Sequence, residues 1–197
     1  MKKATWVAAA AALVLGGTML GPTSAHAQVF TMPYQSTAPG GSDIGLYLSD
    51  GPGDLAIEGI WRRGFGSGDL GLRAGFADLG DGYVLLGADW RQPLNLQTPP
   101  LDLALSLGAQ GGIGNHSGIG GQVGLIVGHT FAETGLRITP FIHPRVAVAA
   151  PLSDGDAEVD VLADLGADFD FSPNLSLRLG VSLGDGPDWG VGLAWRR

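Results

Sequence analysis

The sequence contains no cysteine among its 197 residues. This absence excludes disulfide bonds, thiol nucleophiles, thiolate metal ligands and the modified cysteine of a lipoprotein. Lysine occurs only at Lys2 and Lys3, and the nine other basic residues are arginines, against 19 acidic residues. A chain with this acidic excess is a poor partner for nucleic acid, because such binding depends on neutralising phosphates.

Long apolar runs and helical periodicity are also missing beyond residue 27. No segment there approaches the roughly 20 apolar residues of a membrane-spanning helix. No segment there shows a persuasive 3.6-residue period either. These two absences exclude a helical membrane protein and predict a chain built from strands.

Residues 1–27 have the order of a secretory signal peptide. The pair Lys2-Lys3 gives a positive start, an Ala-rich apolar stretch follows over 6–20, and the segment ends in Ala25-His26-Ala27. An A-x-A ending is typical of a cleavage site. A permanent N-terminal anchor is the alternative, but the stretch is short and interrupted by glycine. We therefore predict a cleaved helical signal peptide and export.

Cleavage after Ala27 would leave 170 residues with a formal net charge of about −10, which is one domain by length. Residues 28–42 are polar and contain proline and glycine, so they are predicted to be a flexible lead-in. Residues 43–197 alternate between apolar and polar positions with a period of two, and they are predicted to form the folded domain.

The alternation is clearest in 175–183, where leucine and valine occupy odd positions while serine, arginine and glycine occupy even ones. The same pattern predicts ten strands, or eight if weak early pairs merge. The predicted ranges are 43–49, 54–63, 69–77, 83–91, 101–110, 120–130, 136–148, 157–171, 174–183 and 188–196. Turn residues rich in Gly, Asp, Pro and Asn separate them. Pro140 and Pro144 each remove a ladder donor, so a bulge or strand end is expected there.

A soluble β-sandwich also alternates, but three features favour a membrane barrel. Several strands hold the alternation for ten or more residues, as a tilted membrane strand requires. Many of the 34 glycines lie on the polar face, which suits a crowded barrel interior. Aromatic residues lie near strand ends, as in an interfacial girdle. That predicted girdle consists of Trp61, Phe76, Trp90, Trp189 and Trp195.

The closing segment FDFSPNLSLRLGVSLGDGPDWGVGLAWRR resembles the outer-membrane β-barrel superfamily, in particular small porin-like or OmpA-like barrels. The resemblance extends as a pattern over most of 43–197. It implies an all-β, closed, antiparallel, up-and-down transmembrane β-barrel of about 8–10 strands, ten favoured, placed in the outer membrane by the insertion machinery. The chain differs from the family at its end, where Trp195 is followed by two arginines instead of closing on an aromatic residue.

Charged residues on the predicted inward face form a candidate lumen network. Its members are Glu58, Arg62, Arg73, Asp89, Asp102, Arg137, Arg145, Asp160, Asp164, Asp168 and Arg178. Two interpretations stay open. The charges pair across the lumen and fill it, because an unpaired buried charge is costly, or they line a narrow path in which the acidic strand 158–170 favours cations. The filled interior is favoured.

No residue set predicts catalysis, a cofactor or a metal. The pair His116-Ser117 in a predicted outer loop is the best hydrolase candidate, but a polar turn accounts for it better. His129 is predicted to lie at an interface and His143 on the inward face, neither clustered with acids at ligand spacing. We therefore expect a barrel that is not an enzyme.

The predicted function is a structural or interaction role in the outer membrane, or a minor narrow pore, with the lipid bilayer and the insertion machinery as partners. The alternatives are a lipid-modifying outer-membrane enzyme and a soluble periplasmic barrel that carries a lipid or small apolar ligand. The strand number, the openness of the lumen, any ligand and the oligomeric state are left open by the sequence.

Overall fold

The computed structural model describes residues 42–50, 55–77, 82–94, 101–114, 117–133, 135–153, 155–184 and 189–197. The predicted signal peptide and nearly all of the predicted lead-in lie outside these ranges. The strands are β1 (Ser42–Asp50), β2 (Leu55–Phe65), β3 (Gly68–Ala77), β4 (Tyr83–Pro93), β5 (Asp102–Ile113), β6 (Gly118–Gly128), β7 (Phe131–Glu133), β8 (Leu136–Pro151), β9 (Glu158–Ser172), β10 (Leu175–Leu183) and β11 (Trp189–Arg196). No helix in the described part of the chain has the length and hydropathy of a membrane span.

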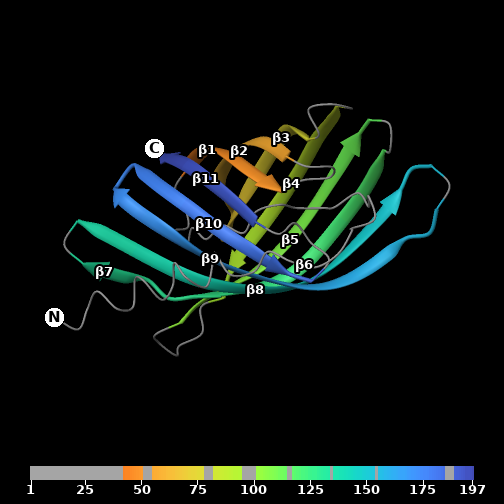
Figure 1. The fold of residues 1–197 in the computed structure, drawn as a ribbon. Coiled ribbons are helices and arrows are strands. Elements are labelled where there is room, and N and C mark those ends of the chain that lie inside the picture. Colours follow the sequence, from red (N-terminus) through yellow and green to blue (C-terminus); the bar gives the residue numbers. More distant parts are fainter. Residues whose placement is uncertain are drawn as a thin grey trace.

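The described strands close into a barrel, with β1 paired to β11 and β6 paired to β8 (Figure 1). Strand β1 pairs with β2 on one side and with β11 on the other, and β6 pairs with both β5 and β8. Strands β6 and β7 form one interrupted strand of the barrel, because the pairs Gly128↔Phe141 and Phe131↔Ile138 keep the same register against β8. The prediction of a closed antiparallel barrel with ten strands, and not eight, is confirmed.

The two prolines within β8, Pro140 and Pro144, do not end or shift the strand. Strand β8 runs unbroken from Leu136 to Pro151, and its register with β9 is constant across Pro140 and Pro144. The pairing with β6 is interrupted opposite Pro144 and resumes in the same register at Ile142. The predicted bulge or strand end is therefore wrong. Each proline lacks a backbone N–H, and the only consequence is a local gap in the ladder on one side of β8.

The two ends of the barrel differ in their connections. The start of β1 and the finish of β11 lie at the same end of the barrel, called the terminal end. There Ser42 pairs with Arg63 and Asp43 pairs with Arg196. Tight turns at this end join β2 to β3 and β9 to β10, the first through Gly66 in a left-handed conformation (φ 62°). Strands β1, β3, β5, β8 and β10 finish at the opposite end, called the loop end, and part of each loop that follows them falls outside the described ranges.

Each strand separates its side chains onto two surfaces, because successive residues point to opposite faces. In β1, Asp43, Tyr47 and Ser49 are buried against the lumen, while Leu46 is exposed on the outside of the barrel. The buried positions across the barrel are mainly polar and charged, and the exposed ones are mainly large and apolar. The interior is thus the polar surface of this molecule.

Candidate functional site in the barrel lumen

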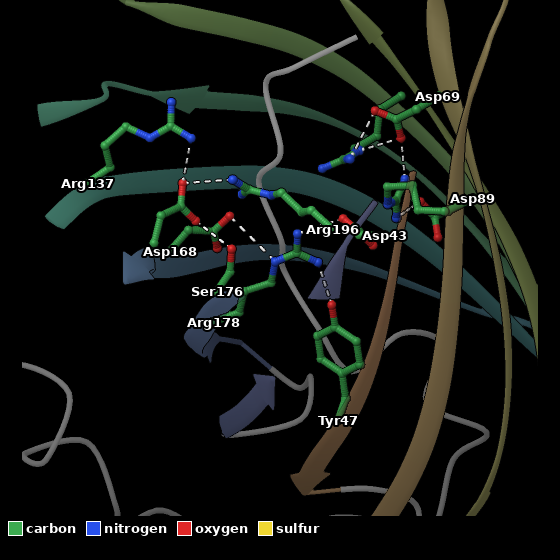
Figure 2. Close-up of polar contacts among 12 residues, drawn as sticks. Asp43, Tyr47, Asp69, Asp89, Arg137, Asp168, Ser176, Arg178 and Arg196 are labelled. Atoms are coloured by element: carbon green, nitrogen blue, oxygen red, sulfur yellow. Dashed lines mark hydrogen bonds and ion pairs between the residues drawn. The ribbon is translucent and has the colours of Figure 1, made fainter. Parts of the chain in front are cut away.

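Arg178 lies at the centre of the polar contacts near the terminal end of the lumen (Figure 2). Its guanidinium donates to Asp43 Oδ2 at 2.8 Å and to the Tyr47 hydroxyl at 2.5 Å. Its Nε lies 3.7 Å from Asp168 Oδ2. Arg178 comes from β10 and Asp43 and Tyr47 from β1, so these bonds pass over the inward face of β11.

Asp170 of β9 gathers a second group of partners at the same end. Its Oδ2 accepts hydrogen bonds from Arg137 at 3.0 Å and from Arg196 at 2.9 Å. Its Oδ1 accepts a bond from the Ser176 hydroxyl at 2.5 Å. Figure 2 shows Arg137 and Arg196 approaching from different walls of the barrel. The Asp170 carboxylate of β9 therefore links this strand to β8, β10 and β11.

The walls formed by β2, β3 and β4 carry a third group of ion pairs. Arg62 bonds Asp69, and it donates to Asp89 Oδ1 at 2.5 Å. Asp69 also accepts two bonds from Arg91, at 2.9 and 3.0 Å. Each arginine here is almost fully buried with its carboxylate. Buried charges persist only when they are paired in this way.

At mid-height, Glu58 pairs with Arg73 on the neighbouring strand. Glu58 also accepts a hydrogen bond from the Gln110 amide at 3.1 Å. Glu58 lies on β2 and Gln110 on β5, with two strands between them in the barrel order. This contact therefore cuts across the lumen instead of following its wall.

Another group joins a serine of β5, a histidine of β8 and an aspartate of β9 in series. The Ser106 hydroxyl lies 2.6 Å from His143 Nε2, and His143 Nδ1 lies 3.0 Å from Asp164 Oδ2. Arg145 donates to both Asp164 oxygens, at 2.7 and 3.1 Å, and Ser182 also bonds this carboxylate. Because all three members of the series are at least nine-tenths buried, their mutual geometry is fixed by packing.

Inward glycines make room for these large side chains. A Cβ added at Gly124 would lie 2.4 Å from His143 Nε2, and one at Gly192 would lie 2.1 Å from the Tyr47 ring. A Cβ at Gly166 would lie 2.4 Å from the Phe141 ring. Side chains from neighbouring strands therefore occupy the space beside the glycines on the polar face. Such crowding is expected in a narrow barrel.

The predicted lumen charges differ in burial and in their ionic contacts. Eight of them are buried and in ionic contact: Glu58, Arg62, Arg73, Asp89, Arg145, Asp164, Asp168 and Arg178. Arg137 lies at the barrel end with its side chain 52% exposed. Asp102 is half-buried and faces Thr130 at 3.5 Å, and Asp160 is half-buried on the same inward face of β9.

Several residues of the lumen network were not predicted from the sequence. They are Asp43, Tyr47, Asp69, Arg91, Ser106, Asp170 and Arg196. The period-two count contains the signal for some of them, since Arg91 follows Asp89 by two residues and Asp170 follows Asp168 by two. Ser106 carries no such signal, because an inward serine beside glycines looks like any small lumen residue.

The predicted girdle residues point outward. Trp61 and Trp195 both lie beside Ile44 near the terminal end, and Trp90 pairs with Leu70 at a similar level. Phe76 and Trp189 lie near the loop end. The exposed fractions of Trp61, Phe76, Trp189 and Trp195 lie between 39% and 59%. The aromatic residues therefore occupy two levels of the outer surface, one toward each end.

The other histidines give no site. His116 lies outside the described residues, and the Ser117 hydroxyl bonds the backbone of Gly114 in a turn. His129 packs edge-on against Phe131, with ring centroids 4.5 Å apart. Within the described ranges, no group of three or more His, Cys, Asp or Glu side chains is placed to hold a metal ion.

Comparisons with known proteins give only distant likenesses. No protein-family model and no curated protein matches the chain. A de novo designed transmembrane β-barrel is similar with a TM-score of 0.40 and 16% identity, over 81% of this chain and 98% of the designed one. KdgM porin is similar with a TM-score of 0.40 and 9% identity, over 79% and 98% of the two chains. Any statement about function must therefore come from the residues themselves.

Proposed function

We propose that this chain is a small outer-membrane β-barrel protein with a structural or interaction role and a lumen largely filled by side chains. The observation that carries the proposal is the apolar outer surface. Leu46, Phe76 and Val161 are exposed by 54%, 59% and 79% of their surface, and similar residues cover the other strands. Among outward side chains that the structure describes, ionisable groups lie near strand ends, at Asp50, Arg63, His129 and Arg197.

A bilayer is the environment that this surface suits. Soluble monomers rarely expose a contiguous apolar patch of more than a few hundred Å². In hydrocarbon the apolar side chains are favourable, and every backbone polar group must be paired within the protein. The closed ladder from β1 to β11 supplies most of that pairing, with a local gap between β6 and β8 opposite Pro144. The predicted signal peptide supports export, and insertion then requires the outer-membrane insertion machinery as a partner.

The polar interior argues against the soluble carrier. A pocket for a lipid or small apolar ligand is lined mostly by apolar and aromatic side chains. The buried lining here consists mainly of polar and charged side chains, among them arginines, carboxylates, serines and a histidine. A barrel with charges inside and leucines outside has the opposite polarity to the one a soluble carrier requires.

Contacts between strands that are not neighbours support a filled lumen over a wide pore. Gln110 on β5 bonds Glu58 on β2, and Arg178 on β10 bonds Asp43 on β1. Side chains that meet in this way occupy the space a solute would need. A minor narrow pore is the second candidate, favoured by the carboxylates at Asp160, Asp164 and Asp168 along one strand.

Fractionation of the native host tests the location. We expect the protein in the outer-membrane fraction, migrating differently on an SDS gel before and after boiling, because a closed barrel resists SDS until it is heated. Recovery from the periplasm as a species whose migration boiling does not change would contradict the proposal.

Planar-bilayer recording separates the filled lumen from the pore. A filled lumen predicts no discrete channel steps in the purified protein. Reproducible cation-selective steps would show that the narrow pore, and not the filled barrel, is correct.

A further inference from the structure

The series Ser106–His143–Asp164 has the connectivity of a nucleophilic triad. The hydroxyl oxygen meets one ring nitrogen of the histidine, and the carboxylate meets the other. In such an arrangement the histidine removes the hydroxyl proton during attack, and the aspartate fixes the ring tautomer and stabilises the imidazolium that forms. The three residues come from β5, β8 and β9, which the pairing of β6 with both β5 and β8 brings side by side in the sheet.

We propose that Ser106 is a nucleophile activated by His143 and Asp164, and that it reacts with small uncharged carboxylic esters that enter the lumen. This inference goes beyond the proposed structural role, and it does not depend on whether the barrel conducts ions.

Two features hold the histidine in the reactive orientation. Gly124 lies directly beneath Nε2, where any larger residue would displace the ring. Arg145 donates two bonds to Asp164 and a third to Gln122 at 2.8 Å, and it thereby fixes the carboxylate. Gly124 and Arg145 are positioning residues, because they act on the site through His143 and Asp164.

Toward the loop end from Ser106, the inward positions of β5 and β6 carry glycines and two glutamines. Gly108, Gly112 and Gly120 are half-buried, whereas Gln110 is buried and bonds Glu58, and Gln122 bonds Arg145. The charged groups around Arg178 and Asp170 lie on the other side of Ser106, toward the terminal end. The proposal therefore requires a small ester to reach Ser106 from the loop end, past Gln110 and Gln122.

The reaction balances without a cofactor. The Ser106 oxygen forms a bond to the ester carbonyl carbon, and its proton passes to His143 Nε2. The ester carbon–oxygen bond then breaks, and the departing alkoxide takes that proton. Water, deprotonated by the same nitrogen, releases the acid and regenerates the serine. Arg91 pairs with Ser106 in the β4–β5 register, and its guanidinium is bonded to Asp69.

The first test is covalent labelling of the folded, purified barrel with diisopropyl fluorophosphate. The serine oxygen would form a bond to phosphorus, fluoride would leave and the proton would pass to His143. We expect one adduct by intact mass, mapped to Ser106 and absent in Ser106→Ala. General-base assistance is worth about 10²–10⁴-fold, so His143→Ala is expected to slow labelling at least about 100-fold. Ser176→Ala is the matched control, since Ser176 is also buried in the lumen but bonds a carboxylate and no histidine.

A cysteine variant separates access from activation. The chain has no cysteine, so Ser106→Cys provides a single thiol for a small methanethiosulfonate reagent. Labelling of both Ser106 and the variant thiol supports the proposal, as does hydrolysis of p-nitrophenyl acetate that is lost in Ser106→Ala. If the thiol reacts but Ser106 does not, the serine is not activated. If neither reacts, the lumen is closed to esters, and either result overturns the proposal. Heat-dependent migration on SDS gels checks that each variant is folded.

Discussion

The inner and outer surfaces of the barrel are built from the same strands but have opposite chemistry. Along β1, the inward Asp43 and Tyr47 bind Arg178, whereas the outward Leu46 is largely exposed. The inner surface is held by specific partners, so a change there removes identifiable bonds. The outer surface is stabilised by its surroundings, so a substitution there changes the stability mainly when it changes the polarity of the side chain. The comparison shows that this fold has a polar, paired interior and an apolar exterior, which is the arrangement that the proposed lipid environment requires.

The largest effect is expected from removing the most connected inner charge. Arg178→Ala leaves Asp43 and Asp168 buried without their nearest cation, and breaking a buried pair in this way costs about 3–5 kcal/mol. The free energy of unfolding, measured by urea titration of tryptophan fluorescence in lipid vesicles, should fall by that amount. Arg63→Ala, at the outward end of β2, is the control and should change it by less than about 0.5 kcal/mol. Equal losses for the two variants would remove the contrast between the surfaces.

The next largest effect is expected from placing a charge on the outer surface. Leu46→Arg puts a guanidinium near the middle of β1, where a lipid-facing arginine costs about 2–4 kcal/mol. The same urea titration in vesicles measures this loss, and Leu46→Val should be nearly neutral. If the arginine variant were as stable as the wild type, the outer surface would not face lipid.

A smaller effect distinguishes inner from outer glycines. Gly192→Ala forces a methyl group into the Tyr47 ring, and overpacking of this kind costs about 1–3 kcal/mol. Gly59→Ala faces outward with its nearest neighbour at an ordinary 3.8 Å, so it should be tolerated. Combining Gly192→Ala with Tyr47→Ala should cost less than the sum of the two single changes. Strict additivity would show that the glycine is not there to accommodate the ring.

The smallest effect is expected at Asp168, whose oxygens accept no hydrogen bond from any described protein group. Asp168→Asn removes a buried charge that has no bonded partner, so stability should change by less than about 1 kcal/mol. Asp164→Asn is the matched contrast, because it weakens the charge-assisted bonds from Arg145, worth about 1.5–3 kcal/mol. Unfolding titrations of the two variants side by side give the difference, and a greater loss at Asp168 would contradict it.

Strand limits could be predicted from the sequence because they depend on local alternation and turn residues. The predicted ranges 69–77 and 174–183 differ from β3 and β10 by one residue at one end. The β8 prolines were the exception, since whether a missing N–H breaks a strand depends on the neighbours that pair with it. Strand β9 keeps its ladder with β8 across both prolines, and only the ladder with β6 is interrupted.

The candidate site was largely beyond sequence reasoning. Ser106 and His143 are 37 residues apart, and Arg178 and Asp43 are 135 apart, so nothing local connects them. His143 could be assigned to the inward face but not given a partner. The missing information is the order and stagger of the strands, which decide which inward positions share a level of the lumen.

The sequence by itself determined the strands, their two faces and the inward direction of most charges, because a period of two is a property of the extended backbone. Only the closed tertiary structure decided which charges meet. Closure brings β1 against β11 and β6 against β8, and the resulting level of each residue places Arg178 beside Asp43 and His143 between Ser106 and Asp164. Those meetings fix the chemistry of the lumen, since a buried polar group takes its role from the partner that satisfies it.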